Sequence, residues 1–295
     1  EIDATDVTAL NDILAIAGTY IVASSFVAEN GSIDIAANAG NIVDSTVVLK
    51  DADGDGLDET VKIFASAELD GVEVSARASV TADAGTYIVD GTYISETSYV
   101  DLSALAGSIT GTTAESKADY VTLDATDDII GVTVEAATTA SLDAGLDITG
   151  GTVNALDTVT LTAGEEINGT TVQTDTLADL LAGLDIVGVS IDAATASLAA
   201  GEDIVGGSVS TTGDATLSAG ADIAGTVVDA DNALLMAGVN IQGVAVNADT
   251  DATLLALGGY IQGSAVLAGN DAYVDAALEI DATDVTALND ILAIA

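Results

Sequence analysis

Apolar and polar residues alternate along most of this chain, and glycine interrupts the alternation at regular intervals. The pattern is clearest in ATLSAGADIAGTVVDA, residues 215–230, whose core reads A-x-L-x-A-G-x-D-I-x-G-x-x-V-x-A. A period of two is typical of β-strands that bury one face, and glycine between such runs indicates tight corners. We therefore expect short strands joined by corners, with no long helices.

The pattern recurs through the whole chain, and a central isoleucine or leucine serves as its anchor. The anchors are Ile2, Ile21, Ile42, Leu69, Ile88, Ile109, Ile129, Ile148, Ile167, Ile186, Ile204, Ile223, Ile241, Ile261 and Ile280. Successive anchor numbers differ by 18 to 21, except for the longer step from Ile42 to Leu69. A repeat of this length with three short strands predicts an all-β fold, a parallel β-solenoid of about 19-residue turns stacked at ~4.8 Å.

Other columns accompany the anchor and predict which residues fill the interior. Leucine stands six positions before it, at Leu123, Leu142, Leu161, Leu180, Leu198, Leu217, Leu235 and Leu255. Valine or isoleucine stands five positions after it, at Val134, Val153, Val172, Ile191, Val209, Val228, Val246 and Val266. Alanine followed by glycine precedes many anchors, and glycine follows two residues later. We expect a narrow core, because alanine and glycine occupy so many of its positions.

The opening segment of the chain, EIDATDVTALNDILAIA at residues 1–17, returns unchanged as residues 279–295. Residues 1–278 span 14 of the shorter turns, so the long repeat closes on whole turns. We interpret residues 1–278 as one solenoid unit with an insertion at about 50–60, and residues 279–295 as the start of the next identical unit. Two other readings stay open: a discrete subunit whose identical ends help it to join the next one, or a cloning duplication.

The chain is strongly acidic, with 48 Asp and Glu against 4 Lys and Arg and a net charge of −44. Contacts with nucleic acid or anionic lipid require cations, so we expect neither partner. The chain has no Pro, Cys, His or Trp. The lack of proline suits uninterrupted strands, and apolar stretches such as ILAIA are too short to span a membrane. We therefore expect no membrane insertion.

One acidic column precedes the anchor in successive turns. It comprises Asp128, Asp147, Glu166, Asp185, Asp203 and Asp222, and Asn240 continues it. Equivalent residues in adjacent turns lie about 4.8 Å apart, where two unit charges repel by about 1 kcal/mol in bulk water. Salt, partial protonation or weakly bound divalent cations could each offset this repulsion. Beside it runs a hydroxyl column, for which ordinary cross-strand pairing is expected: Thr133, Thr152, Thr171, Ser190 and Ser208.

The most specific local motif is DADGDGLDE, residues 51–59, within the single long step between anchors. Alternate carboxylates followed by glycine at the sixth position resemble the calcium loop of EF-hands and of calcium repeats in extracellular adhesive proteins. By that resemblance the Ca²⁺ ligands are Asp51, Asp53, Asp55, the carbonyl of Leu57, and Glu59 directly or through water. Position twelve is Lys62, where an EF-hand has a bidentate acid, so this departure implies weaker binding or a substitute ligand such as Asp58 or an acid from a neighbouring turn. The alternative is an acidic surface bulge.

The turn sequence resembles the repeats of filamentous haemagglutinin and related two-partner-secretion adhesins. TLTAGEEINGTTV, residues 160–172, and ATLSAGADIAGT, residues 215–226, carry this resemblance, which covers residues 118–263 well and the rest loosely. It implies a long right-handed β-helix, exported to the bacterial surface and used for attachment or matrix building.

These patterns favour a non-enzymatic function. No histidine or cysteine is present as base or nucleophile, and no phosphate-binding or dinucleotide motif appears. We expect no catalysis and no small-molecule substrate. The leading hypothesis is a structural segment of an extracellular or cell-surface filament that associates with itself head to tail. The alternative is the stalk of a secreted adhesin that binds host cells or matrix. An ice-binding solenoid is disfavoured, because only one incomplete hydroxyl column is present.

Overall fold

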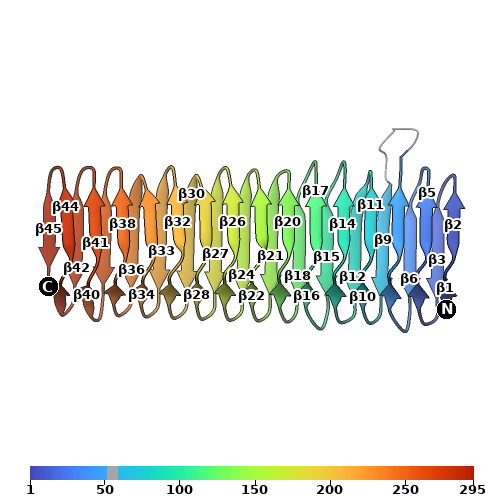
Figure 1. Cartoon of the computed structure of the whole chain (residues 1–295), viewed down its shortest axis with the longest axis horizontal. Coiled ribbons are helices and arrows are strands. Elements are labelled where there is room, and N and C mark those ends of the chain that lie inside the picture. Colours follow the sequence, from blue (N-terminus) through green and yellow to red (C-terminus); the bar gives the residue numbers. More distant parts are fainter. Residues whose placement is uncertain (52–58) are drawn as a thin grey trace. The chain divides into compact units, whose positions relative to one another are not determined.

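The computed structural model describes residues 1–51 and 59–295, and within these ranges the chain contains strands and no helix. The strands form about 15 coils of a parallel β-solenoid, with three strands in each coil (Figure 1). The coils belong to two compact units. The N-terminal unit comprises Glu1–Leu146 and Gly151–Leu156, and the C-terminal unit comprises Asp147–Gly150 and Asp157–Ala295. The predicted fold class is confirmed.

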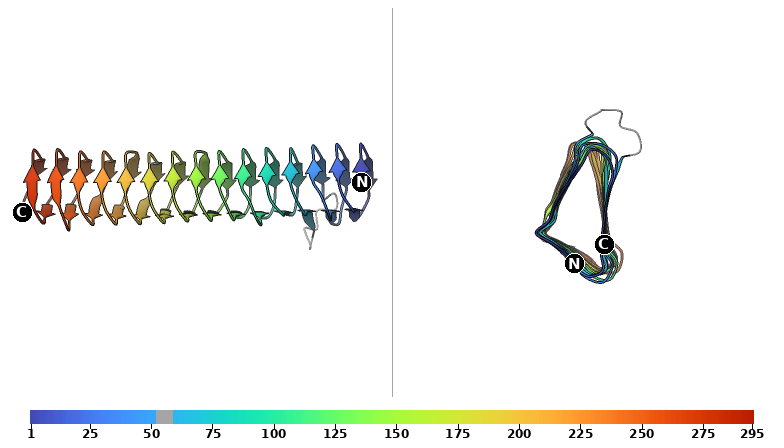
Figure 2. Two further views of the ribbon diagram at one scale, coloured as in Figure 1. Left: turned by 90° about the horizontal axis from the view of Figure 1, so that it is seen from below. Right: turned by 90° about the vertical axis from the view of Figure 1, so that its right-hand side faces the viewer.

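A single coil shows how the sequence pattern produces the fold. β33 (Asp214–Ala219), β34 (Ile223–Ala224) and β35 (Val227–Ala230) form its three sides. Leu217, the anchor Ile223 and Val228 are buried, one on each side, while their neighbours in the strands point outward. The triangular outline of the coils in each unit is visible end-on in Figure 2. The anchor, leucine and valine columns are therefore the three walls of one core.

Three parallel sheets build the N-terminal unit. Sheet A contains β1 (Ile2–Asp3), β4 (Ile21–Val22), β7 (Ile42–Val43), β10 (Leu69–Asp70), β13 (Ile88–Val89), β16 (Ile109–Thr110) and β19 (Ile129–Ile130). Sheet B contains β2 (Asp6–Ala9), β5 (Ser25–Ala28), β8 (Thr46–Leu49), β11 (Glu73–Ala76), β14 (Thr92–Ser95), β17 (Thr113–Ser116), β20 (Thr133–Ala136) and β23 (Thr152–Ala155). Sheet C contains β3 (Ile13–Ala17), β6 (Ile33–Ala37), β9 (Thr60–Ala65), β12 (Ser79–Ala84), β15 (Val100–Ala104), β18 (Val121–Ala125) and β21 (Thr139–Ala144).

The C-terminal unit repeats the arrangement. Its sheet A contains β22 (Ile148–Thr149), β25 (Ile167–Asn168), β28 (Ile186–Val187), β31 (Ile204–Val205), β34, β37 (Ile241–Gln242), β40 (Tyr260–Gln262) and β43 (Glu279–Asp281). Sheet B contains β26 (Thr171–Thr174), β29 (Ser190–Ala193), β32 (Ser208–Thr211), β35, β38 (Ala245–Ala248), β41 (Ala265–Ala268) and β44 (Asp284–Ala287). Sheet C contains β24 (Thr158–Ala163), β27 (Leu177–Ala182), β30 (Thr195–Ala200), β33, β36 (Asn232–Ala237), β39 (Ala252–Ala256), β42 (Ala272–Ala276) and β45 (Ile291–Ile294).

The prediction that Leu255 belongs to the buried leucine column is wrong. Leu254, and not Leu255, pairs with Leu235 and is fully buried, while Leu255 points outward. The corner between β39 and the anchor Ile261 is one residue longer than the corner between β36 and its anchor, so the buried leucine lies one position earlier. Counting back from the anchor therefore fails where corner length changes.

Two glycine columns meet different structural demands. Gly188 has a φ of +61°, and a Cβ there would meet nothing within 4 Å, so glycine in this column favours the left-handed backbone conformation that alanine or aspartate adopts at the same position in other coils, as at Ala23 and Asp90. Gly183 instead lies so close to the preceding coil that an added Cβ would be 2.0 Å from the Gly164 carbonyl oxygen. Its column lets the neighbouring corners between sheets C and A approach closely.

No helix in the described part of the chain is long and apolar enough to cross a membrane.

Candidate functional site

The acidic column of the C-terminal unit is a ladder of hydrogen bonds between side chains and backbone. Asp203 Oδ1 accepts the amide of Asp222 at 2.8 Å, and Asp222 Oδ1 accepts the amide of Asn240 at 2.9 Å. Asp185 Oδ1 likewise accepts the Asp203 amide at 2.9 Å. Each carboxylate therefore satisfies a corner amide of the next coil, as an ionised N-cap residue does in a helix. These carboxylate residues are half-buried.

Glu166 is the member of the column that interrupts this ladder. Its own amide donates to Asp147 Oδ1 at 2.9 Å. Within the described ranges, however, its carboxylate forms no hydrogen bond with the Asp185 amide, although aspartate does so at the equivalent step in other coils. The additional methylene of glutamate moves the carboxylate away from the next corner. In the N-terminal unit other side chains make the equivalent step, since Ser108 Oγ accepts the Asp128 amide at 3.2 Å and Asn41 Oδ1 accepts the Glu68 amide at 3.3 Å.

This ladder gives the predicted weak cation column a structural role of its own. When an aspartate oxygen accepts a hydrogen bond from a backbone amide, the amide dipole points toward it and offsets part of its negative charge. The ladder therefore offsets part of the repulsion between stacked acids, and weak cation binding by the column stays a prediction.

A second ladder runs along the corner that precedes sheet C. In the C-terminal unit, Asp251 Oδ1 accepts the Asp271 amide and Asp271 Oδ1 accepts the Asp290 amide, both at 3.1 Å. In the N-terminal unit, Asp12 Oδ1 accepts the Ser32 amide at 2.8 Å. No pattern in the sequence indicates this ladder, because Asp, Asn, Ser, Thr, Tyr and Leu share the position.

Only two of the six predicted calcium ligands lie within the described residues. Asp51 is 4% exposed and has a left-handed φ of 49°. Glu59 Oε1 accepts the Gly31 amide of the preceding coil at 2.6 Å. Asp53, Asp55, Leu57 and Asp58 lie outside the described residues. Within residues 1–51 and 59–295, no group of three or more Asp, Glu, His or Cys side chains could hold a metal ion.

Hydroxyl groups form two columns, of which the sequence pattern indicated one. The expected column opens the strands of sheet B, where Thr133 pairs with Thr152 in the N-terminal unit. In the C-terminal unit, Ser190 Oγ and Ser208 Oγ are 3.3 Å apart. The second column is buried between sheets A and B. There Thr226 Oγ1, 1% exposed as a residue, donates to the Gly206 carbonyl at 3.0 Å.

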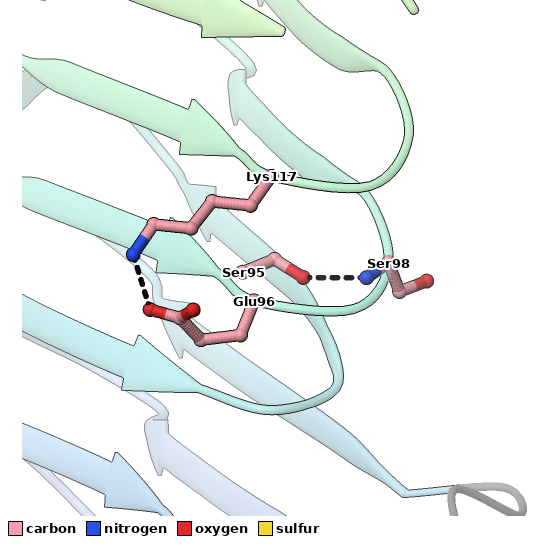
Figure 3. Close-up of polar contacts among 4 residues, drawn as sticks. All are labelled: Ser95, Glu96, Ser98 and Lys117. Carbon is pink, nitrogen blue, oxygen red and sulfur yellow. Dashed lines mark hydrogen bonds and ion pairs between the residues drawn. The ribbon is translucent and has the colours of Figure 1, made fainter. Parts of the chain in front are cut away.

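Three of the four basic residues lie at the corner between sheets B and C of the N-terminal unit. Lys50 Nζ pairs with Glu29 Oε1 at 2.7 Å, and Lys117 Nζ pairs with Glu96 Oε1 at 2.5 Å, while Arg77 occupies the coil between Lys50 and Glu96. Figure 3 shows the Lys117–Glu96 pair beside Ser95, whose Oγ accepts the Ser98 amide at 3.0 Å. Both pairs link adjacent coils, but they are exposed, so each contributes little stability.

The outer face of sheet C in the N-terminal unit carries acids that face one another diagonally. Burial, then Asp83, then Asp124, raise the pKa of Asp101 above its ordinary value. Burial raises the pKa of Asp83 in the same direction. Tyr99 and Tyr120 stack at 4.9 Å over the preceding corner. Ionisation of these carboxylates is therefore less favourable than it is in solvent.

The surface has shallow hollows over sheet B. One of about 350 Å³ in the C-terminal unit is lined mainly by Val227, Ala245, Ala265 and Leu267, with Asp229 and Asn247 at its sides. Val227 and Leu267 are about half exposed. The lining is mostly apolar, and Asp229 and Asp284 are its two carboxylates.

Comparison of the chain with protein-family models, curated proteins and solved structures gave no match. The fold and its ladders are therefore the basis for the functional argument, and the resemblance to haemagglutinin repeats stays a sequence-based prediction.

Proposed function

We propose that the chain is a structural repeat segment of a long extracellular filament or surface fibre, assembled from units joined head to tail. One observation carries the proposal. The two identical segments, residues 1–17 and 279–295, form the same coil, with β2 at Asp6–Ala9 matched by β44 at Asp284–Ala287, yet each pairs with different neighbouring strands. One sequence therefore accepts one neighbour on each side, as a repeating filament requires.

The charge and composition support a mechanical function over a catalytic one. A net charge of −44 keeps filaments apart in solution and disfavours nucleic-acid or anionic-lipid partners. The chain lacks histidine and cysteine. We propose that it has no enzymatic activity and no small-molecule substrate.

The second candidate function is the stalk of a secreted adhesin. The resemblance of residues 160–172 and 215–226 to haemagglutinin repeats favours it. A stalk and a filament share the solenoid and differ in their ends, because a stalk carries a binding tip and has finite length.

Electron microscopy of the native material tests the proposal. Long uniform fibres with a meridional spacing near ~4.8 Å support the filament. Short rods with a distinct tip support the adhesin stalk. A monodisperse native protein of 28.9 kDa would overturn the filament.

We further propose that Ca²⁺ stabilises the unit at the loop 51–59, on the strength of the DADGDGLDE motif. Calorimetry should show one binding event per unit in the wild type and none in the double variant Asp53→Asn with Asp55→Asn. A matched control replaces two outward acids of sheets B and C, Asp179→Asn with Asp192→Asn, and should retain binding. Equal calcium binding by the wild type and the loop variant would refute the assignment.

A further inference from the structure

The repeated segment lets the register of the junction between units be read from the structure. Residues 1–17 show how this coil contacts the coil that follows it, and residues 279–295 show how it contacts the coil that precedes it. The two segments match position by position, because their sequences are identical. Asp12 and Asp290 are therefore equivalent residues of this coil. Two further equivalent pairs are Asp3 with Asp281 and Asp6 with Asp284.

Resting on the proposed filament, we infer that the two segments are one shared coil of the polymer. Its partner is a second copy of this unit, whose residues 18–37 stack on residues 279–295 in the register seen between residues 18–37 and 1–17. Each filament repeat then corresponds to residues 1–278 and contains 14 coils. The competing arrangement stacks residues 279–295 of one chain directly on residues 1–17 of the next and contains 15 coils.

Hydrogen bonds on the two faces of this coil are complementary. At the corner before sheet C, the Asp290 amide donates backward to Asp271 Oδ1 at 3.1 Å. In the other copy the Asp12 carboxylate accepts forward from the Ser32 amide at 2.8 Å. The amide and carboxylate of this aspartate thus face opposite neighbours, and no atom is required twice. A shared coil continues the second ladder through the junction.

The outward-facing aspartates of this coil distinguish the shared arrangement from the stacked one. In sheet A, Asp281 pairs with Gln262, which donates to its Oδ2 at 3.0 Å, and the equivalent Asp3 pairs with Val22. In sheet B, Asp284 pairs with Ala265. The equivalent Asp6 pairs with Ser25. A shared coil therefore places both acids between uncharged neighbours.

Stacked copies would instead place Asp3 on Asp281 and Asp6 on Asp284. Like charges directly opposite each other in adjacent strands destabilise a sheet, and no ladder amide compensates for these strand positions. Either arrangement covers the apolar Ile291, so the outward acids are what distinguishes them.

The first experiment measures the axial repeat of the native filament by cryo-electron microscopy. Sharing predicts 14 coils, about 67 Å at ~4.8 Å per coil, and stacking predicts 15 coils, about 72 Å. A filament with 15 coils per repeat would overturn the shared coil and leave the proposed filament intact. Absence of any filament would remove the proposed function, and the second experiment would still decide the junction.

The second experiment compares two recombinant two-unit proteins. In the first, residues 1–278 are joined directly to residues 1–295, which yields a shared coil. In the second, two full copies of residues 1–295 are joined through Gly-Thr, which restores the corner length that Gly18 and Thr19 provide after Ala17. Hydrogen exchange followed by mass spectrometry reports the protection of the junction amides in each.

We expect exchange at the stacked junction to be about tenfold faster or more than at the shared junction. Asp281→Asn with Asp284→Asn in the first copy should restore most of that protection, because it removes the opposed charges. Asp229→Asn with Asp275→Asn, outward acids elsewhere in the same unit, should not restore it. Equal protection of the two junctions without any substitution would overturn the inference.

Discussion

Asp203 Oδ1 lies 2.8 Å from the backbone amide of Asp222 in the next coil and accepts its hydrogen bond. The bond links two acids of like charge through a backbone group, so the acidic column stabilises the corner where it was expected to strain it. Substitutions at Asp203 can separate the effect of its negative charge from the effect of its hydrogen bond.

Replacement of Asp203 by alanine should destabilise the corner by about 1 kcal/mol, because the Asp222 amide loses its acceptor. Asp203→Asn should have a much smaller effect, since an amide oxygen can accept the same bond, as Asn240 does from Tyr260 at 3.1 Å. Exchange of the Asp222 amide, measured by NMR, checks both. If alanine and asparagine had equal effects, charge and not hydrogen bonding would govern this column.

Glu166→Asp should stabilise the C-terminal unit by about 0.5–1 kcal/mol, because the shorter side chain can reach the Asp185 amide as its equivalents do. Glu165→Asp makes the same chemical change at the adjacent exposed position and should be neutral. Thermal and guanidinium unfolding of the two variants provide the comparison. A destabilised Glu166→Asp protein would contradict the ladder.

Tyr93→Phe should stabilise the N-terminal unit by about 1–3 kcal/mol, the cost of a buried hydroxyl without a partner. Tyr93 is fully buried, its hydroxyl has no hydrogen-bond partner among the described residues, and burial raises its pKa. The equivalent residue three coils earlier is Phe26, which is also fully buried. Tyr87→Phe, at a tyrosine that is 41% exposed, is the control and should change the melting temperature little.

Gly188→Ala and Gly183→Ala should differ in severity. The first places alanine at a φ of +61° with open space around its Cβ, which costs about 1–2 kcal/mol. The second drives a methyl group to 2.0 Å from a backbone oxygen of the preceding coil, so the coils must separate. We expect a larger loss of stability and local amide protection for Gly183→Ala. Equal melting temperatures would show that the corners are not closely packed.

Asp101→Asn should stabilise the N-terminal unit at neutral pH and lose this advantage in acid. The pKa of Asp101 is raised in the folded state, so its ionisation costs stability above that pKa. The cost disappears as pH falls through the folded pKa, which lies above the ordinary value of 3.8. Melting temperatures from neutral pH down to about 3.5 check the trend. Asp179→Asn is the control, because its diagonal neighbours, which include Thr162 and Ala199, are uncharged, whereas those of Asp101 include Asp83 and Asp124.

The sequence alone determined the architecture, because the alternation and the repeat are local rules that each coil obeys. Ile223, Leu217 and Val228 are assigned to the core by position in the repeat, and all three are buried. The Leu255 prediction failed because counting from an anchor assumes a constant corner. Whether the corner length is constant depends on how each corner packs against its neighbours. The sequence of a single coil does not show this packing.

The hydrogen bonds of the two ladders could be assigned only from the tertiary structure. The sequence predicted the acidic column from its spacing, but only the folded coils show that Asp203 meets a backbone amide, since that amide belongs to Asp222, one full turn further along the chain. The second ladder could not be predicted, because its position holds hydrogen-bonding residues of several types and, at Leu177, an apolar one. Sequence periodicity reports which residues stack, while the direction of each side chain at a corner follows from the backbone geometry of two coils together.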